Sequence, residues 1–353
     1  MLVDSPPEQS VEHGSAPSPR NLRKRNAVRA AGLVVSLGVL VLVMLASIAV
    51  GAKTIPFEDV WHGLAHYSGT GDDVIVRDVR VPRTILGVLA GAALGTAGAV
   101  MQGLTRNPLA EPGILGVNAG ASAAVVSAIS FLGVTSLTGY VWFAFLGAGA
   151  VSALVYVLGG SRGATPVRLA LAGTAATAAL YGYVNAVQLL DSAALERLRF
   201  WTVGSLASAD MAVVGKVWPF IAVGLVLALL LARPLNAMEM GEDSARALGV
   251  HLTRTRILSM VAVTLLCGAA TAACGPIVFI GLMVPHLVRA VTGPDMRWIL
   301  PYAAVLAPVL LLGSDVVGRV VTSPSELQVG IVTALIGGPV FIHLVRRRRM
   351  GQL

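Results

Sequence analysis

The chain has 353 residues, of which 56% are hydrophobic and 12% are charged, and its formal net charge is +8. Soluble globular domains carry roughly 25% charged residues, so a mean hydropathy of +0.79 over this length excludes an ordinary soluble protein. We expect an all-α polytopic membrane protein. Its two cysteines, Cys267 and Cys274, indicate neither a disulfide framework nor a metal site.

The first 28 residues are polar and rich in proline and serine, and a basic cluster marks their end. This composition predicts a disordered cytoplasmic tail, residues 1–28, in front of the first membrane helix. The apolar segment that follows, residues 30–52, is longer than the apolar core of a cleaved signal peptide.

Ten segments approach the roughly 20 apolar residues that a membrane helix needs. They form one transmembrane domain over residues 29–346, followed by a basic cytoplasmic C-terminal tail, residues 347–353. The segments lie near 30–52, 84–103, 114–133, 141–160, 168–190, 212–232, 256–274, 276–292, 298–316 and 328–345.

The basic residues are distributed unequally between the two sides that ten spans would create. If the N-terminus is cytoplasmic, 18 Lys and Arg residues fall on the cytoplasmic side and 8 on the other. This asymmetry satisfies the positive-inside rule and places the C-terminus in the cytoplasm too. The net charge is therefore an orientation signal, and it gives no reason to expect a nucleic-acid partner.

A polar run between the second and third segments, residues 106–116, contains two prolines and two glycines. Such a run cannot continue a helix, because proline lacks a backbone donor and clashes with the preceding turn. Held between two membrane helices, it predicts a shaped turn more than a slack loop. We expect packing of the subunit core to be its main role.

The longest cytoplasmic connection, between Arg233 and Arg256, contains a candidate short helix over residues 242–250. Asp243 or a neighbour can cap its N-terminus, and Gly249 can supply the left-handed residue that ends it. A helix this short is marginal alone in water. It either rests on its own protein or packs against a partner.

No motif of a known enzyme class is present in the sequence. There is no P-loop and no HExxH zinc motif, and no serine–histidine pair stands in a recognisable nucleophile context. His286 is open to a structural or a functional role. We therefore expect a chain that is not itself an enzyme.

The 18 acidic residues can all be assigned to tails, loops or helix ends, with Asp315 and Glu326 nearest to burial. Carriers that use proton or sodium gradients usually place ionisable groups near the bilayer centre. Their absence here favours a transporter that receives its energy from a partner. A stand-alone secondary carrier or channel is the alternative from another class, and a membrane enzyme is the remaining one.

Four stretches together resemble the permeases of the FecCD family, the membrane subunits of ABC importers for ferric siderophores, haem and cobalamin. The resemblance runs from about residue 30 to residue 346, in the order and spacing of the family. The stretches are Val79–Thr84, Arg106–Gly120, Ser244–Val250, and Gly281–Arg289 with Gly293–Asp295.

The resemblance implies a type II ABC importer permease fold in a bacterial cytoplasmic membrane. It also implies three partners: an ABC ATPase dimer that uses ATP, an extracytoplasmic substrate-binding protein, and a second permease, identical or related. No cofactor or metal is expected on this chain, because the cargo arrives already chelated. Ferric siderophore is the expected cargo, with haem or cobalamin as the alternative.

The resemblance also assigns roles to individual residues. Coupling to the ATPase is implied for Glu242, Ser244, Ala245, Arg246, Leu248 and Gly249. Docking of the binding protein is implied for Arg80, Arg83 and Arg319, although Arg80 and Arg83 can instead be interfacial anchors of the second helix. Proximity to the cargo pathway is implied for Thr165, Tyr181, Asn185, Ser192 and Val329.

Overall fold

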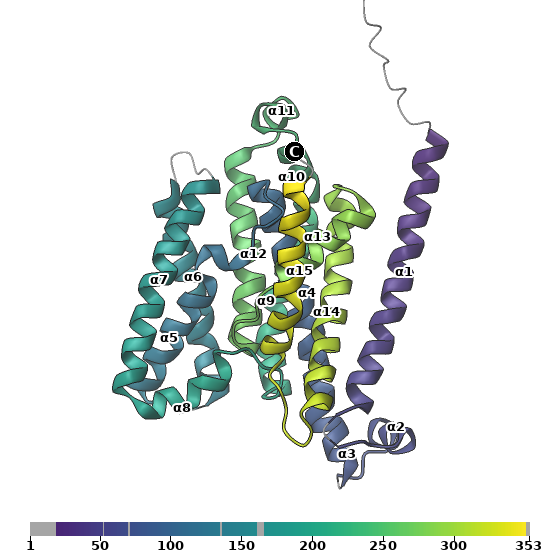
Figure 1. Ribbon diagram of the computed structural model, residues 1–353, viewed down its shortest axis with the longest axis vertical. Coiled ribbons are helices and arrows are strands. Elements are labelled where there is room, and N and C mark those ends of the chain that lie inside the picture. The colour runs from purple at the N-terminus through teal and green to yellow at the C-terminus, as the bar shows by residue number, and fades with distance from the viewer. Residues whose placement is uncertain (1–18, 52, 70, 135, 161–165, 351–353) are drawn as a thin grey trace, which may run out of the picture.

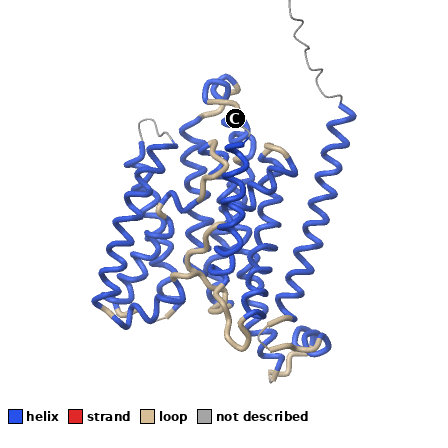
Figure 2. The backbone as a smooth tube through the Cα atoms, in the orientation of Figure 1, coloured by secondary structure: helices blue, strands red, loops and turns tan. Residues whose placement is uncertain are grey.

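The computed structural model describes residues 19–51, 53–69, 71–134, 136–160 and 166–350. These residues form helices joined by turns and loops, and no strand occurs among them (Figure 2). The all-α expectation is therefore confirmed.

The helices in chain order are α1 (Pro19–Ala49), α2 (Phe57–Ala65), α3 (Asp72–Val74), the π-helix η1 (Ile75–Arg80), α4 (Val81–Thr105), the 3-10 helix η2 (Pro112–Leu115), α5 (Val117–Leu132), α6 (Leu137–Gly160), α7 (Pro166–Leu190), α8 (Ser192–Trp201), α9 (Met211–Leu230), α10 (Ala232–Glu239), α11 (Glu242–Ala247), α12 (Leu252–Cys274), α13 (Ile280–Thr292), α14 (Met296–Val321) and α15 (Val329–Met350).

Each of the ten expected membrane segments falls on one helix. Within the described part of the chain, six helical stretches are long and apolar enough to cross a membrane, and they contain α1, α4, α6, α9, α12 and α14. Shorter apolar stretches occupy α5, α13 and residues 329–343 of α15. The remaining segment corresponds to α7, which is 25 residues long.

The first helix begins earlier in the chain than expected. Residues 1–18 lie outside the described residues, but residues 19–28, which we expected to be disordered, are the first turns of α1. Pro19 suits the first position of a helix because its missing N–H needs no partner there. Once the apolar part is helical, each added arginine, lysine or alanine extends the helix without a new nucleation cost.

Two ends of the bundle can be distinguished in Figure 1. The first end holds α10, α11, the start of α1 and the end of α15, and we call it the α11 end. The opposite end holds α2, α3 and α8, and we call it the α2 end. Helix α1 stands at one edge of the bundle, α5 to α8 stand at the other edge, and α4, α9 and α12 to α14 lie between them.

The centre of the bundle is packed through small residues, as Gly98 of α4 illustrates. A Cβ atom at this position would lie 1.8 Å from the carbonyl oxygen of Gly281 in α13. The two helix backbones therefore touch, in the manner typical of small-residue contacts between membrane helices.

The polar run at residues 106–116 forms a fixed turn at the end of α4. Arg106 has a left-handed backbone with φ of 51°, and the Asn107 N–H donates to the Gln102 carbonyl at 3.2 Å. After η2, Gly116 has φ of 71° and begins α5. The Glu111 carboxylate accepts a hydrogen bond from the Phe279 N–H at 3.1 Å, just before α13 begins. The predicted shaped turn is confirmed, and it contributes to packing as expected.

Candidate functional site

Helix α11 is the short helix expected at residues 242–250. It ends as predicted, because Gly249 has φ of 79°. The Val250 N–H donates to the Ala245 carbonyl at 3.0 Å and the Gly249 N–H donates to the Arg246 carbonyl at 2.9 Å, which together make a Schellman cap. The N-terminus differs from the expectation, since Gly241 precedes the helix and no side chain caps it. Asp243 is already within the first turn.

The carboxylate of Glu242 ties α11 to two neighbouring elements. It accepts a hydrogen bond from Arg256 of α12 at 2.6 Å, and it lies 3.9 Å from a guanidinium nitrogen of Arg106. Arg246, one turn further along α11, approaches it at 3.5 Å. The fully buried methyl group of Ala245 packs on the same side. These contacts fix the orientation of α11 on the bundle.

The opposite face of α11 has no cover among the described residues. The side chains of Asp243 and Arg246 are 101% and 61% exposed, and Leu248 is 63% exposed. Ser244, Ala247 and Gly249 are also exposed. An exposed leucine between charged side chains, on a helix held firmly from behind, suits a groove on a second protein. Of the six residues expected to take part in coupling, only Ala245 is buried.

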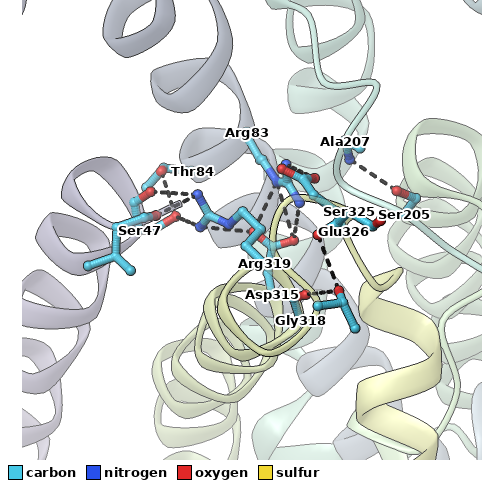
Figure 3. Close-up of polar contacts among 12 residues, drawn as sticks. Ser47, Arg83, Thr84, Ser205, Ala207, Asp315, Gly318, Arg319, Ser325 and Glu326 are labelled. Atoms are coloured by element: carbon cyan, nitrogen blue, oxygen red, sulfur yellow. Dashed lines mark hydrogen bonds and ion pairs between the residues drawn. The ribbon is translucent and has the colours of Figure 1, made fainter. Parts of the chain in front are cut away.

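At the α2 end, a cluster of buried charges surrounds Asp315 of α14 (Figure 3). Arg83 of α4 donates to this carboxylate from Nη2 at 2.7 Å and from Nε at 3.0 Å. Its Nη1 donates to Glu326 at 2.7 Å. Arg319 lies one turn beyond Asp315 on α14 and pairs with it at 3.1 Å. The buried carboxylate of Asp315 therefore forms ion pairs with two buried arginines.

Arg319 and Arg80 also hold the end of α1. Arg319 Nη1 donates to the carbonyls of Ser47 and Val50 at 3.0 and 2.9 Å. Arg80 Nη1 donates to the carbonyls of Ile48 and Ala49 at 2.8 and 2.7 Å, and its Nη2 donates to the Lys53 carbonyl. The last carbonyls of a helix lack partners within it and carry partial negative charge, so two guanidinium groups stabilise this terminus.

The three arginines expected to dock the binding protein all make contacts inside the protein, and their docking role stays a prediction. Arg80 and Arg83 are each 5% exposed and Arg319 is 2% exposed, so a second protein does not reach Arg80 or Arg319 in this conformation. The Arg80 guanidinium binds the end of α1 and the Arg83 guanidinium binds Asp315, and the alternative role of both residues as interfacial anchors stays a prediction. Arg83 borders a cavity of about 390 Å³, which Glu326, Ser205 and Gln328 also line.

The expected pathway residues fall into three groups. Thr165 lies outside the described residues. Tyr181 and Asn185 are exposed one turn apart on α7, and Ser192 is exposed at the start of α8. Val329 is fully buried and therefore does not line an open pathway here. The Gly330 N–H donates to the Gly204 carbonyl at 3.0 Å, which holds the start of α15 against that loop.

Sequence reasoning missed the partners of these side chains. The spacing of Asp315 and Arg319 could have indicated the pair, since residues four apart face each other on a helix. The contacts of Glu242 with Arg256 and Arg106 carried no comparable signal, because the three residues belong to different elements.

A family model, individual relatives and a solved structure all match most of this chain. The model of the FecCD transport family matches residues 39–347. The ferric enterobactin transport system permease protein FepD of Escherichia coli is 45% identical, with 89% of this chain and 95% of the relative covered. The hemin transport system permease protein HmuU of Yersinia pestis is 36% identical, with 88% and 93% covered. A solved metal-chelate type ABC transporter in an inward-facing conformation superposes with a TM-score of 0.79 at 27% identity, covering 90% of this chain and 99% of that one.

Proposed function

The chain belongs to the FecCD transport family, and on that premise we propose that it carries a ferric siderophore across a bacterial cytoplasmic membrane. It acts as the membrane-spanning permease subunit of an ATP-driven importer. Several relatives support this cargo, since their names describe siderophore or ferric chelate transport. Relatives named for haemin and cobalamin, at 36% and 37% identity, make those the alternative cargoes.

The observation that carries the proposal is the geometry of α11. Its exposed face, with Leu248 at 63% exposure, offers a ridge for a groove on an ABC ATPase dimer. Its buried face is tied through Glu242 to Arg256 at the start of α12. Movement of the ATPase subunits during ATP binding and hydrolysis then displaces α11 and α12 together. The ATPase hydrolyses ATP, and this chain transmits the resulting movement from α11 to α12.

The α11 end is cytoplasmic in this proposal, and so are both chain termini. The excess of arginine at the side assigned to α11 supports the orientation. The extracytoplasmic binding protein then delivers cargo at the α2 end. Arg83, with Glu326 beside it at the cavity of about 390 Å³, is the arginine best placed to meet an acidic side chain of that protein.

A second permease completes the cargo pathway. The exposed side chains of Tyr181 and Asn185 on α7 and of Ser192 on α8 are the candidate contacts with cargo. Exposed apolar residues on the same helix, Leu189 and Leu190 at 87% and 90%, require cover from lipid or from the second permease.

The test combines copurification with uptake. The full chain is coexpressed with the ABC ATPase and binding protein of the same organism, and cells are supplied with iron-55 chelates of catecholate and hydroxamate siderophores. Labelled haem and cobalamin serve as the competing cargoes. We expect the ATPase to copurify and one ferric siderophore to accumulate only when that ATPase is active.

The variant Leu248→Glu should abolish both copurification and uptake, because it buries a charge at the groove. Asp243→Asn, on the same helix, is the matched control, since its side chain is fully exposed. Uptake that continues with an inactive ATPase would instead identify a secondary carrier, and accumulation of haem or cobalamin alone would refute the siderophore assignment.

A further inference from the structure

A second cavity lies at the α11 end, between the first turns of α1 and the connection from α13 to α14. Its volume is about 670 Å³, and six of the residues that line it are Arg25, Asn26, Arg29, Asn236, Asp295 and Arg297. It is separate from the exposed face of α11 and from the cavity beside Arg83. None of the proposed transport roles uses it.

Two arginines of α1 converge at this cavity. A Cβ atom added to Gly293 would lie 3.1 Å from Nη2 of Arg25 and 3.4 Å from Nη2 of Arg29. Arg29 is held in place, since it donates to the Thr292 carbonyl and its own carbonyl accepts from the Tyr302 hydroxyl at 2.6 Å. Two like charges, one exposed and one half-buried, are therefore kept close together, and an anion placed between them would interact favourably with both.

The acidic residues of the cavity do not supply that anion. Asp295 is bound by Arg297, with Nη2 to Oδ2 at 2.8 Å, and by Asn236 at 2.7 Å. Glu239 pairs with Arg289 at 2.8 Å. Among the described residues, no carboxylate forms an ion pair with Arg25 or Arg29. Within the described residues, the cavity thus holds two positive charges without a carboxylate partner.

The cavity also lies where a membrane surface would meet the bundle. The Arg29 guanidinium stands 5.9 Å from the ring centroid of Trp298, and tryptophan is enriched at the headgroup level. Val34 and Val35, 67% and 66% exposed, begin the apolar surface of α1 about 8 Å further along the helix axis. An anion that fits this site therefore carries a phosphate at one end and hydrocarbon at the other.

We propose that this cavity binds the headgroup of an anionic phospholipid, with the phosphate between Arg25 and Arg29 and the acyl chains along the apolar surface of α1. Basic pockets between membrane helices on the cytoplasmic side are suited to such headgroups. Asn26 provides an amide group for the hydroxyls of a glycerol headgroup. The bound lipid fastens α1 to the connection between α13 and α14.

The test titrates the purified full chain in detergent with dioctanoyl phosphatidylglycerol and follows the midpoint of thermal unfolding. We expect a saturable rise, no rise with dioctanoyl phosphatidylcholine, and none with inorganic phosphate at the same concentration. Arg25→Gln with Arg29→Gln should raise the lipid concentration that gives half of the rise by about thirtyfold, from about fivefold for each lost charge near a headgroup. Arg23→Gln with Lys24→Gln removes the same charge from the same helix outside the cavity, and should raise that concentration by about threefold at most.

Asn26→Trp fills the cavity while keeping every charge, and it should also abolish the response. This variant keeps the test decisive if the double arginine variant does not fold. If both double variants weaken lipid binding equally, diffuse attraction to the basic surface of α1 explains the binding, and the proposed site is wrong. An equal rise with inorganic phosphate would make it a free-anion site, and a flat titration with phosphatidylglycerol would refute it.

Discussion

Arg83 and Asp315 are 232 positions apart in the chain, yet Nη2 of one lies 2.7 Å from Oδ1 of the other. Their side chains are 6% and 0% exposed. Since Arg319 shares the same carboxylate, Asp315 is the anion that allows two arginines to be buried at the α2 end. The pair therefore links α4 to α14 and, through Arg319, to the end of α1.

Asp315→Ala should strongly destabilise the protein. It leaves Arg83 and Arg319 buried with less compensating charge, and breaking a buried ion pair on one side costs about 3–5 kcal/mol. We expect a large fall in the thermal unfolding midpoint in detergent. Glu196→Gln, which breaks the exposed pair with Arg199 on α8, is the control and should cost about 0–1 kcal/mol. Equal effects of the two variants would contradict the central role of Asp315.

Glu242→Gln should uncouple ATP hydrolysis from uptake while the bundle stays folded. The substitution removes the carboxylate that binds Arg256 at 2.6 Å and approaches Arg106, so α11 moves without carrying α12. Partly exposed pairs contribute about 1 kcal/mol or less, so the unfolding midpoint should change little.

The neighbouring Asp243→Asn removes the same charge from a side chain that pairs with Arg246 of the same helix. ATPase activity and uptake are measured together in proteoliposomes. Full coupling of ATP hydrolysis to uptake in Glu242→Gln, or an equal loss of coupling in Asp243→Asn, would contradict the inferred transmission of movement from α11 to α12.

Gly98→Ala should separate α4 from α13. The added methyl would lie 1.8 Å from the Gly281 carbonyl oxygen, and overpacking of this kind costs about 1–3 kcal/mol or more. Gly313→Ala in α14 is the matched control, because a Cβ atom there meets nothing within 4 Å. The control should be neutral or stabilising by about 0.5–1 kcal/mol. Yield of monodisperse protein and the unfolding midpoint measure both, and an unaffected Gly98→Ala would show that the helices can move apart freely.

Asp295 should make stability depend on pH in acid. Burial alone raises the pKa of this carboxyl, but hydrogen bonds from Arg297 and Asn236 outweigh it and lower the pKa from 3.8 to about 2. A lowered pKa contributes stability that is present above 3.8 and is lost as pH falls through about 2.

Asp295→Asn keeps a helix-capping side chain without the charge. The difference in unfolding midpoint between wild type and variant should be constant near neutral pH and should shrink in acid as pH falls below 3.8 towards about 2. A difference that stays constant through this range would contradict the assigned pKa.

The sequence predicted what depends on local patterns. Apolar length predicted where ten helices lie, and six of them contain stretches long and apolar enough to cross a membrane. The glycine at position 249 predicted the end of α11, because only a left-handed residue closes such a cap. The burial of the arginines at the α2 end could not be predicted, because distant residues make their environment. Arg80 is buried because it binds the end of α1, and the residues around Arg80 do not predict where α1 ends.

The contacts of Arg319 with the end of α1 have a consequence for how the protein is made. The guanidinium of Arg319 binds the Ser47 carbonyl across 272 positions of the chain. A ribosome adding about 5–20 residues per second needs tens of seconds or less to cover that interval. During this time the first helix has been synthesised while the side chain that secures its far end does not yet exist. Insertion of the first helix and its final fixation are therefore two separate events, and the second must wait until nearly the whole polypeptide has left the ribosome.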